Sequence, residues 1–574
     1  MTPNPLEQPD QYAREVDRTF AVLARDYLDD RAQRHPESAT DLGDHRFDAQ
    51  LSDESAAALA DERRSLAGYA ARLTALDDRA LAPEQAVDAA MLAQDVDQRI
   101  FELDELREHT WNPLLANPGR AIYQLLARDF APLPERLASL AGRLAAVPAA
   151  LDAARHRLGP MPRVHLETAI TQFGGTIELV SSGLDAALAD EPAGAARLAQ
   201  ARPAALAALT EHRAWLSARL AAGSEFAEAR IGAALFGRKL SLTLGAATDA
   251  DAILARAEAD LDRVSAEISA LAAEISDTAG VPDARAIEGD PVVRRVLDRL
   301  GADTADDETI LPFCRAAFVT ATSFARDADL VTLYADPVEV IEMPELDRGV
   351  AVAYCDAPGP LETAPTPTFL AVSPTPAGWP ADRVASFYRE YNRHMVHNLI
   401  VHEAMPGHYL QLGHSRRFAG SSTGVRAALR SGSFVEGWAV YAEQLMAAHG
   451  YPGEGDPRAV RMQQLKMQLR MIINTILDAR VHGRGMTEPE AMRLMTGRGY
   501  QEEGEAAGKW RRALLTSAQL STYYVGYTEV ADLAAELLAA GGRGQRAVHD
   551  QMLAHGSPPV RLLRTLLSPA GSVR

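Results

Sequence analysis

The segment from His402 to His408 reads HEAMPGH, and it decides how the rest of the chain is interpreted. A helical histidine–glutamate pair followed by a second histidine is typical of a site that holds a divalent metal, with a carboxylate beside the metal's open position. In the zinc-peptidase pattern H-E-x-x-H the histidines are four residues apart and share one helix face. Here they are six residues apart, which rotates an ideal helix about 240° beyond one full turn. On an unbroken helix the two imidazoles would point in different directions.

Pro406 and Gly407 lie between the two histidines and offer a way around this problem. Proline cannot donate a backbone hydrogen bond and clashes with the carbonyl four residues earlier, whereas glycine adopts dihedral angles that other residues avoid. Together they predict a kink or a widened, π-like turn. Such a turn would bring His402 and His408 to one point, with Glu403 in the position of a general base.

A third metal ligand is expected in the segment SFVEGWAVYAE, Ser433 to Glu443. A catalytic zinc ion has three protein ligands and keeps its fourth position open. Glu436 fits this role, and its alternative is a solvated helix carboxylate. The aromatic residues of the segment disfavour that alternative, because a buried carboxylate requires a cation or a metal. We therefore expect one zinc ion per chain, bound by His402, His408 and Glu436.

At this point the chain resembles the bacterial family called domain of unknown function 885 (DUF885), whose members resemble zinc metallopeptidases of the gluzincin type. Its pattern H-E-A-x-P-G-H-H-x-Q is matched from His402 to Gln411, with Tyr409 in place of the last histidine. Its block E-G-W-A-x-Y-x-E is matched from Glu436 to Glu443. Further family blocks match three other segments: His35–Asp48, Leu477–Thr487 and Gln519–Gly526. The resemblance spans nearly the whole chain.

The resemblance implies a mainly α fold, a large two-lobed helical protein with a small β-sheet beside the metal-binding helix, as in zinc metallopeptidases. It also implies a zinc-dependent hydrolase, a metallopeptidase that cleaves short peptides with Glu403 as general base. Tyr523 matches the family tyrosine and is our candidate donor to the oxyanion. Tyr524 and Tyr527 are alternatives to it, and packing of all three in the core is another.

His482 is a second candidate for transition-state stabilisation or substrate binding, with Asp478, one turn earlier, to orient it. The competing interpretation is a histidine at a helix C-terminus, where the helix dipole favours it. Glu443 is expected to support a metal-binding histidine from behind. A carboxypeptidase would also need a cation for the substrate carboxylate, and the available arginines near the motifs are Arg417, Arg430 and Arg480.

The 574-residue chain is too long for one hydrophobic core, so we divide it into a helical lobe, 1–305, and a metal-binding lobe, 306–574. Apolar residues at three- and four-residue steps predict successive helices from about residue 11 to residue 300. Three stretches rich in β-branched and aromatic residues, 331–343, 348–358 and 368–376, predict a small sheet. One of these strands either pairs with an extended substrate or serves as a scaffold for the metal helix. Helical patterns return in 383–404, 425–449, 458–482 and 488–495.

The net charge of −20 argues against a nucleic-acid partner and against docking on anionic lipid. Two cysteines in so long a chain favour a reducing compartment. No basic segment followed by an apolar run begins the sequence, and no stretch of about 20 apolar residues occurs in it. We therefore expect a cytoplasmic protein with no membrane partner and a small peptide or amide as substrate.

Two other functions stay open. One is a metal-dependent amide hydrolase or tailoring enzyme of a small-molecule pathway, because a fold does not fix its substrate. The other is a non-catalytic binding relative, which Glu403 speaks against, since a structural metal site needs no base. The sequence does not select the end preference or the oligomeric state.

Overall fold

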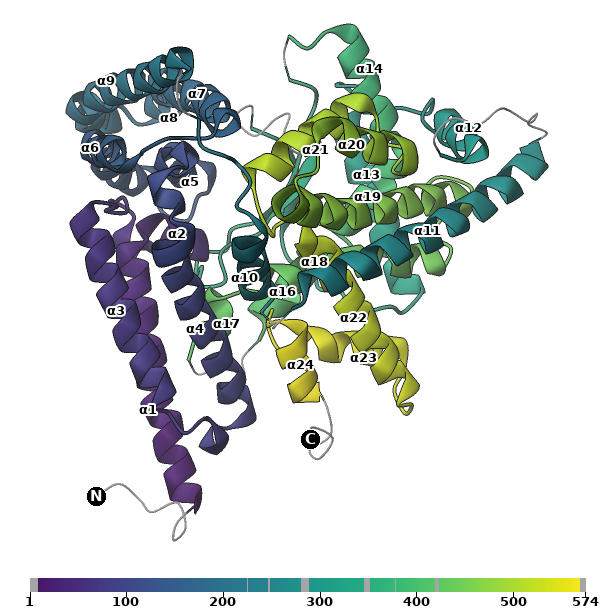
Figure 1. Ribbon diagram of the computed structural model, residues 1–574, viewed down its shortest axis with the longest axis horizontal. Helices are drawn as coiled ribbons and strands as arrows, with labels where there is room; N and C mark the ends of the chain where they lie inside the picture. The colour runs from purple at the N-terminus through teal and green to yellow at the C-terminus, as the bar shows by residue number, and fades with distance from the viewer. Residues whose placement is uncertain are drawn as a thin grey trace. The chain divides into compact units, whose positions relative to one another are not determined.

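The structure is a computed structural model that describes residues 9–223, 226–245, 248–279, 289–344, 352–376, 378–418 and 423–567. In these ranges the chain is mainly α-helical (Figure 1). It has one three-stranded sheet. The mainly α class and the small sheet that the sequence predicts are confirmed.

The chain divides into two compact units. Unit 1 consists of Met1–Ala229 together with Pro358–Thr366 and Ala419–Leu429, and unit 2 consists of Arg230–Ala357, Pro367–Phe418 and Arg430–Arg574. This division falls after residue 229, whereas the sequence suggested residue 305. The reason is that the long helix between those positions, α11 (Ala250–Ala279), packs along α19 (Pro457–Arg484) of unit 2 (Figure 1).

Unit 1 is built from helices alone in its described residues. They are α1 (Pro9–Arg34), α2 (Pro36–Leu42), α3 (Ala56–Thr74), α4 (Pro83–Phe101), α5 (Gly119–Ala127), α6 (Leu133–Arg157), α7 (Arg163–Glu178), α8 (Asp185–Asp190), α9 (Pro192–Ala222) and the short α17 (Val425–Ala428). Leucines spaced along α6 and α9 fill a core of their own, as expected for amphipathic helices with one apolar stripe each.

Helix α6 is long and apolar enough to cross a membrane by length and composition, with a mean hydropathy of 1.3 over its best window. No such stretch was predicted from the sequence. Its apolar residues, including Leu137, Leu140 and Leu144, pack into the unit 1 core. Arg136 and Arg143 are buried on the same helix and donate hydrogen bonds to backbone carbonyls. We therefore interpret α6 as a core helix.

Unit 2 contains the second core, the sheet and the remaining helices. The helices are α10 (Ala233–Leu244), α11, α12 (Pro291–Leu300), α13 (Ile310–Asp327), α14 (Ala381–Glu390), α15 (Arg393–Glu403), α16 (His408–Arg416), α18 (Gly432–Ala448), α19, α20 (Glu488–Arg493), α21 (Glu503–Leu515), α22 (Ser521–Ala539), α23 (Gln545–Leu553) and α24 (Val560–Leu567). Helix α19 is buried along most of its length, so it is the central element on which the neighbouring helices pack.

The sheet consists of β1 (Val338–Glu342), β2 (Ala353–Asp356) and β3 (Thr368–Val372), in the order β1-β3-β2. Strands β1 and β3 run parallel, whereas β2 is antiparallel to β3, with Cys355 opposite Leu370. Strand β2 is therefore an edge strand, and it lies against α15. The predicted position of the sheet, beside the helix that begins the HEAMPGH segment, is confirmed.

Two helices that the sequence predicted as continuous are interrupted. The predicted helix 383–404 is α14 and α15, because Asn392 ends the first and caps the second by accepting a hydrogen bond from the backbone N–H of Met395. The predicted helix 425–449 is α17 and α18, where Ser431 caps α18 in the same way. Short polar residues at these positions compete with the helical backbone for hydrogen bonds.

Candidate metal centre

The HEAMPGH segment is a break between two helices rather than a kink within one. Helix α15 ends at Glu403, the Met405–Pro406 peptide is cis, and α16 begins at His408. The backbone N–H of Gly407 reaches back six residues to the carbonyl of Val401, at 3.0 Å. A Cβ atom on Gly407 would lie 1.9 Å from the carbonyl oxygen of His402, so no other residue fits at this turn. The glycine therefore allows the second helix to restart close to the first.

This break brings the three predicted ligands together. One ligand atom from each of His402, His408 and Glu436 lies within 4.8 Å of the others. Glu436 Oε2 is 3.5 Å from His402 Nε2 and 3.6 Å from His408 Nε2. The two imidazole rings are nearly perpendicular, with centroids 4.7 Å apart. All three side chains keep a small exposed fraction, 13%, 11% and 23% respectively, so the centre can be reached by solvent.

Helix α18 positions Glu436 with the two residues that follow it in the sequence. Trp438 is fully buried, and its indole N–H donates a 2.8 Å hydrogen bond to the carbonyl of Pro406, which fastens the turn to α18. Gly437 faces Gly526 of α22, where an added Cβ would lie 2.3 Å from the Gly526 carbonyl carbon. The E-G-W sequence therefore supplies a carboxylate, a close helix crossing and an anchor for the turn.

Behind the centre, Glu443 orients His402. One carboxylate oxygen is 2.7 Å from His402 Nδ1, and the other accepts a 2.6 Å hydrogen bond from the Asn398 side chain. A carboxylate on the distal nitrogen fixes the ring orientation and directs Nε2 to the centre. The position that the sequence analysis suggested for Glu443 agrees with this contact. Asn398 was not predicted from the sequence. Its place on α15, one turn before His402, could have indicated it.

Glu403 points to the edge strand. Its Oε2 accepts a 3.0 Å hydrogen bond from the backbone N–H of Cys355 in β2. This contact favours the scaffold interpretation of the strand at that residue. The partner is a backbone group far away in the sequence, so no motif could have indicated it.

Tyr523 differs from the other two candidate tyrosines in its hydrogen-bond partner. Its hydroxyl accepts a 3.3 Å hydrogen bond from Arg512. By contrast, Tyr524 donates to Asp260 and Tyr527 donates to Gln444, each at 2.6 Å. The helices α18 and α22 cross closely at Gly437 and Gly526, and burial together with the charge of Glu436 raises the pKa of Tyr523.

His482 lies in a different environment. It is buried, and its Nε2 is 2.9 Å and 2.8 Å from the carbonyl oxygens of Ala513 and Thr516. Its Nδ1 faces the backbone N–H of Ile231 at 3.4 Å. These contacts do not include the metal-centre residues. The hydrogen bonds therefore assign His482 to the support of the segment that leads into α22.

Asp478 does not orient His482 by a hydrogen bond, as the sequence analysis proposed. Its carboxylate accepts hydrogen bonds from the backbone N–H groups of Ala518 and Ser521, both at 3.0 Å, and from the Ser521 hydroxyl at 2.8 Å. These partners surround the first turn of α22, where a carboxylate is favoured by the helix dipole. Asp478 thus holds the start of the helix that carries Tyr523.

The charges of the centre depend strongly on one another. Burial lowers the pKa of His402, but the carboxylates of Glu436 and Glu443 outweigh it and hold this pKa well above its ordinary value. Burial raises the pKa of Glu436, yet the two histidines lower it far below its ordinary value. Burial also raises the pKa of Glu403 and of Tyr523. A positive charge is therefore favoured between the histidines and Glu436.

The residues fit a zinc ion. Two imidazole nitrogens and one carboxylate are a donor set that zinc uses in catalytic sites, and tetrahedral ligands about 2.1 Å from the ion lie about 3.4 Å apart. The two nitrogen–oxygen distances of 3.5 and 3.6 Å are close to this spacing. Glu436 Oε2 is buried and makes no hydrogen bond with the described residues. A buried carboxylate oxygen without a hydrogen bond destabilises the fold unless a cation binds it.

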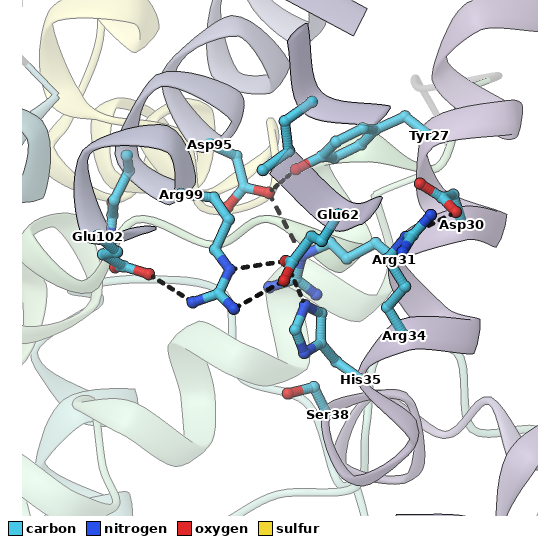
Figure 2. A pocket seen from close by; sticks show the side chains of 12 residues that line it. Tyr27, Asp30, Arg31, Arg34, His35, Ser38, Glu62, Asp95, Arg99 and Glu102 are labelled. Atoms are coloured by element: carbon cyan, nitrogen blue, oxygen red, sulfur yellow. Dashed lines mark hydrogen bonds and ion pairs between the residues drawn. The ribbon is translucent and has the colours of Figure 1, made fainter. Parts of the chain in front are cut away.

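Unit 1 contains a separate polar hollow of about 210 Å³, between α1, α3 and α4. Figure 2 shows that its charged side chains point toward one another rather than into open space. Arg99 donates hydrogen bonds to both oxygens of Glu62, which also contacts His35, and Tyr27 binds Asp95. Since opposite charges are already paired there, we regard this hollow as structural.

Two solved structures resemble the chain over nearly its full length. The first is described as a "putative lipoprotein of unknown function from Shewanella oneidensis", with 29% identity, a TM-score of 0.79, and coverage of 96% of this chain and 99% of that one. The second, a "putative lipoprotein from Colwellia psychrerythraea", has 16% identity and a TM-score of 0.75, and the match covers 96% and 98% of the two chains. The second likeness shows the fold alone. No curated protein matches the chain.

The first of these structures contradicts the cytoplasmic location that was predicted from the sequence, because it is described as a lipoprotein, a class attached to membranes outside the cytoplasm. The prediction relied in part on a low cysteine count. The two cysteines are free, and Cys314 is buried. A protein that needs no disulfide folds in either compartment, so the count does not discriminate between them.

The match to a family model extends over residues 36–567, which includes both units and every residue of the centre. The chain therefore belongs to the family described as bacterial protein of unknown function (DUF885).

Proposed function

We propose that this protein is a zinc-dependent hydrolase, a metallopeptidase of the gluzincin type that cleaves short peptides. The observation that carries the proposal is the convergence of His402, His408 and Glu436 within 4.8 Å, with Glu403 adjacent to the first ligand. Two imidazoles and one carboxylate leave a fourth zinc position open, as catalysis requires. A purely structural site would be closed by a fourth protein ligand.

His402, His408 and Glu436 would hold the ion, and bound zinc would supply a Lewis acid that polarises the scissile carbonyl. Glu403 takes a proton from the attacking water and passes it to the leaving amine. The N–H of Cys355 fixes the Glu403 carboxylate through one oxygen, which leaves the other oxygen for the proton transfer. Tyr523 donates a hydrogen bond to the oxygen that becomes negative during attack, and Arg512 holds the tyrosine in place.

The location of the two similar structures suggests where this activity takes place. We propose that the chain, like the proteins described as lipoproteins, works outside the cytoplasm. Its substrates would then be short peptides present in that compartment.

A Glu403→Gln variant tests the proposal. It keeps the shape of the side chain and all three ligands but removes the base, so zinc content should stay at one per chain while peptide turnover falls by about 10³-fold or more. The zinc content of the purified protein is measured by elemental mass spectrometry, and turnover is measured by digestion of a peptide library. Full turnover in this variant would refute the role of Glu403. Cleavage of small amides but of no peptide would favour a small-molecule amide hydrolase.

A further inference from the structure

Two positive charges on α21 lack a carboxylate partner among the residues that the structure describes. Lys509 and Arg512 are three residues apart and therefore lie on one face of the helix. Only 8% of Lys509 is exposed, and its ammonium group makes no hydrogen bond or ion pair with the described residues. Arg512 donates only to neutral groups, the Gln519 side-chain oxygen at 2.9 Å and the Tyr523 hydroxyl at 3.3 Å.

The acidic side chains near Lys509 are already used by other cations. Lys466 binds Glu390 at 2.9 Å, and Arg470 pairs with both Glu390 and Glu505. Burial and the two neighbouring guanidinium groups, Arg470 and Arg512, hold the pKa of Lys509 well below its ordinary value. A buried and unpaired ammonium group is destabilising, so the protein bears a cost here that an incoming anion would relieve.

Lysine is also uncommon in this chain. The sequence contains three lysines, Lys239, Lys466 and Lys509, among its 58 basic residues. Arginine supplies the other 55 basic residues. Of the arginines that the sequence suggested for a substrate carboxylate, Arg417 is bound to Asp336, Arg480 is bound to Glu258, and Arg430 also has an interaction. These arginines are therefore less available to a substrate carboxylate than Lys509 and Arg512 are.

Arg512 links the pair to the candidate oxyanion donor. It donates a hydrogen bond to the Tyr523 hydroxyl, and the charge of Glu436 contributes to the raised pKa of Tyr523. An anion bound by Arg512 would therefore lie beside the Tyr523 hydroxyl. If the scissile carbonyl of a substrate reaches Tyr523, the negative charge that Lys509 and Arg512 bind would lie close to the scissile bond.

We propose that Lys509 and Arg512 form an anion subsite that binds the free C-terminal carboxylate of a peptide or acyl-amino-acid substrate. The guanidinium fork matches the planar carboxylate, and the ammonium group adds a second charge-assisted hydrogen bond. This inference rests on the proposed hydrolase function and makes it specific: the enzyme removes the last residue of its substrate.

The test measures binding to the zinc-loaded Glu403→Gln chain, which does not consume its ligand. The probes are N-acetyl-alanyl-alanyl-phenylalanine and its C-terminal amide, which differ only in the negative charge. Calorimetry should show the acid binding about 100-fold more tightly than the amide, as expected for a buried charge pair. The Lys509→Met and Arg512→Gln variants, each made in the Glu403→Gln chain, should reduce this ratio to near one.

Lys239→Met is the matched control, because it removes the same charge from a lysine that binds Ser517 outside the pair. It should leave the acid-to-amide ratio unchanged. Lys509→Arg, which keeps the charge, should restore part of the preference. Without ligand, Lys509→Met should raise the unfolding temperature, since it removes an unpaired buried charge. A lysine with a purely structural role would give the opposite shift.

The outcomes separate this inference from the proposed function. Equal affinities for acid and amide in a chain that holds one zinc ion would overturn the anion subsite and leave the hydrolase in place. A preference for the acid that persists in both Lys509→Met and Arg512→Gln would also overturn it. Absence of bound zinc would instead refute the hydrolase itself, before any peptide is compared.

Discussion

Two groups of histidine and carboxylate among the described residues of unit 2 differ in where their hydrogen-bonding atoms point. At the metal centre the Nε2 atoms of His402 and His408 converge on a Glu436 oxygen that makes no hydrogen bond with described residues. Around His482 and Asp478 the corresponding atoms are directed at backbone carbonyl and N–H groups. Both groups belong to motifs of the family, yet their environments support different roles.

A histidine that belongs to a family motif is therefore not always a functional histidine. A set of ligand atoms that face one another and have no backbone partners is suited to a cation. A set that is satisfied by the backbone is suited to holding loops and helix ends. Substituting one residue of each group tests whether the two groups have different roles.

The largest effect is expected for the ligands themselves. His408→Ala or Glu436→Ala should abolish stoichiometric zinc binding, because a catalytic site with two protein ligands is incomplete. His482→Asn should retain one zinc per chain and lose stability instead. Metal analysis together with thermal unfolding measures both. Loss of zinc in His482→Asn with an unchanged unfolding temperature would reverse the assignment of the two groups.

Tyr523 gives the next largest effect. Tyr523→Phe should lower kcat by about 10²-fold, the usual range for the loss of one oxyanion donor, with zinc content unchanged. Tyr524→Phe is the control, since its hydroxyl binds Asp260 away from the centre, and it should leave kcat near the parent value. Equal losses in both variants would point to a structural effect of α22 rather than to catalysis.

Glu443 contacts His402 and is not one of the three proposed zinc ligands. Glu443→Gln should weaken zinc binding by about 10–100-fold, as is usual for carboxylates that orient a ligating histidine. The corresponding change in the second group, Asp478→Asn, should leave zinc affinity unchanged and lower the free energy of unfolding by about 1–3 kcal/mol. Chelator competition and denaturant titration separate the two results.

Zinc affinity should also depend on pH in a defined direction. The pKa of His402 in the metal-free protein lies well above its ordinary value because of Glu436 and Glu443. His402 is therefore protonated at neutral pH and must release a proton to bind zinc. Affinity should rise by about tenfold per pH unit for one proton until this pKa is passed. An affinity independent of pH between 6 and 8 would show that His402 is not a ligand.

The smallest effect concerns packing. Gly437→Ala would place a methyl group against Gly526, so we expect a destabilisation of about 1–3 kcal/mol from overpacking. Gly432→Ala, on the same helix, is the control, because an added Cβ there meets no atom within 4 Å. Similar unfolding free energies for the two variants would show that the close crossing of α18 and α22 is not required.

Much of this arrangement could be predicted from the sequence because it depends on local chemistry. Pro406 and Gly407 indicated an irregular turn, and the spacing in Ser433–Glu443 indicated Glu436 as the third ligand. The three strands lie where β-branched residues predicted them. Helix breaks at Asn392 and Ser431 were missed, although both are residues that commonly cap helices.

The features that could not be predicted depend on tertiary contacts. Asp478 and His482 are four residues apart on one helix, which suggested a hydrogen bond between them. The backbone of residues 513–521 supplies stronger partners for both. In the same way, Lys509 and Arg512 have no motif of their own. Only the tertiary structure shows that Arg512 contacts the Tyr523 hydroxyl.

The most direct test of the metal centre is anomalous X-ray diffraction at the zinc absorption edge from crystals grown with zinc. We expect one strong peak, bounded by His402 Nε2, His408 Nε2 and the Glu436 carboxylate. No peak at this position under saturating zinc, or a peak bound by other side chains, would contradict the assignment of these three residues as ligands.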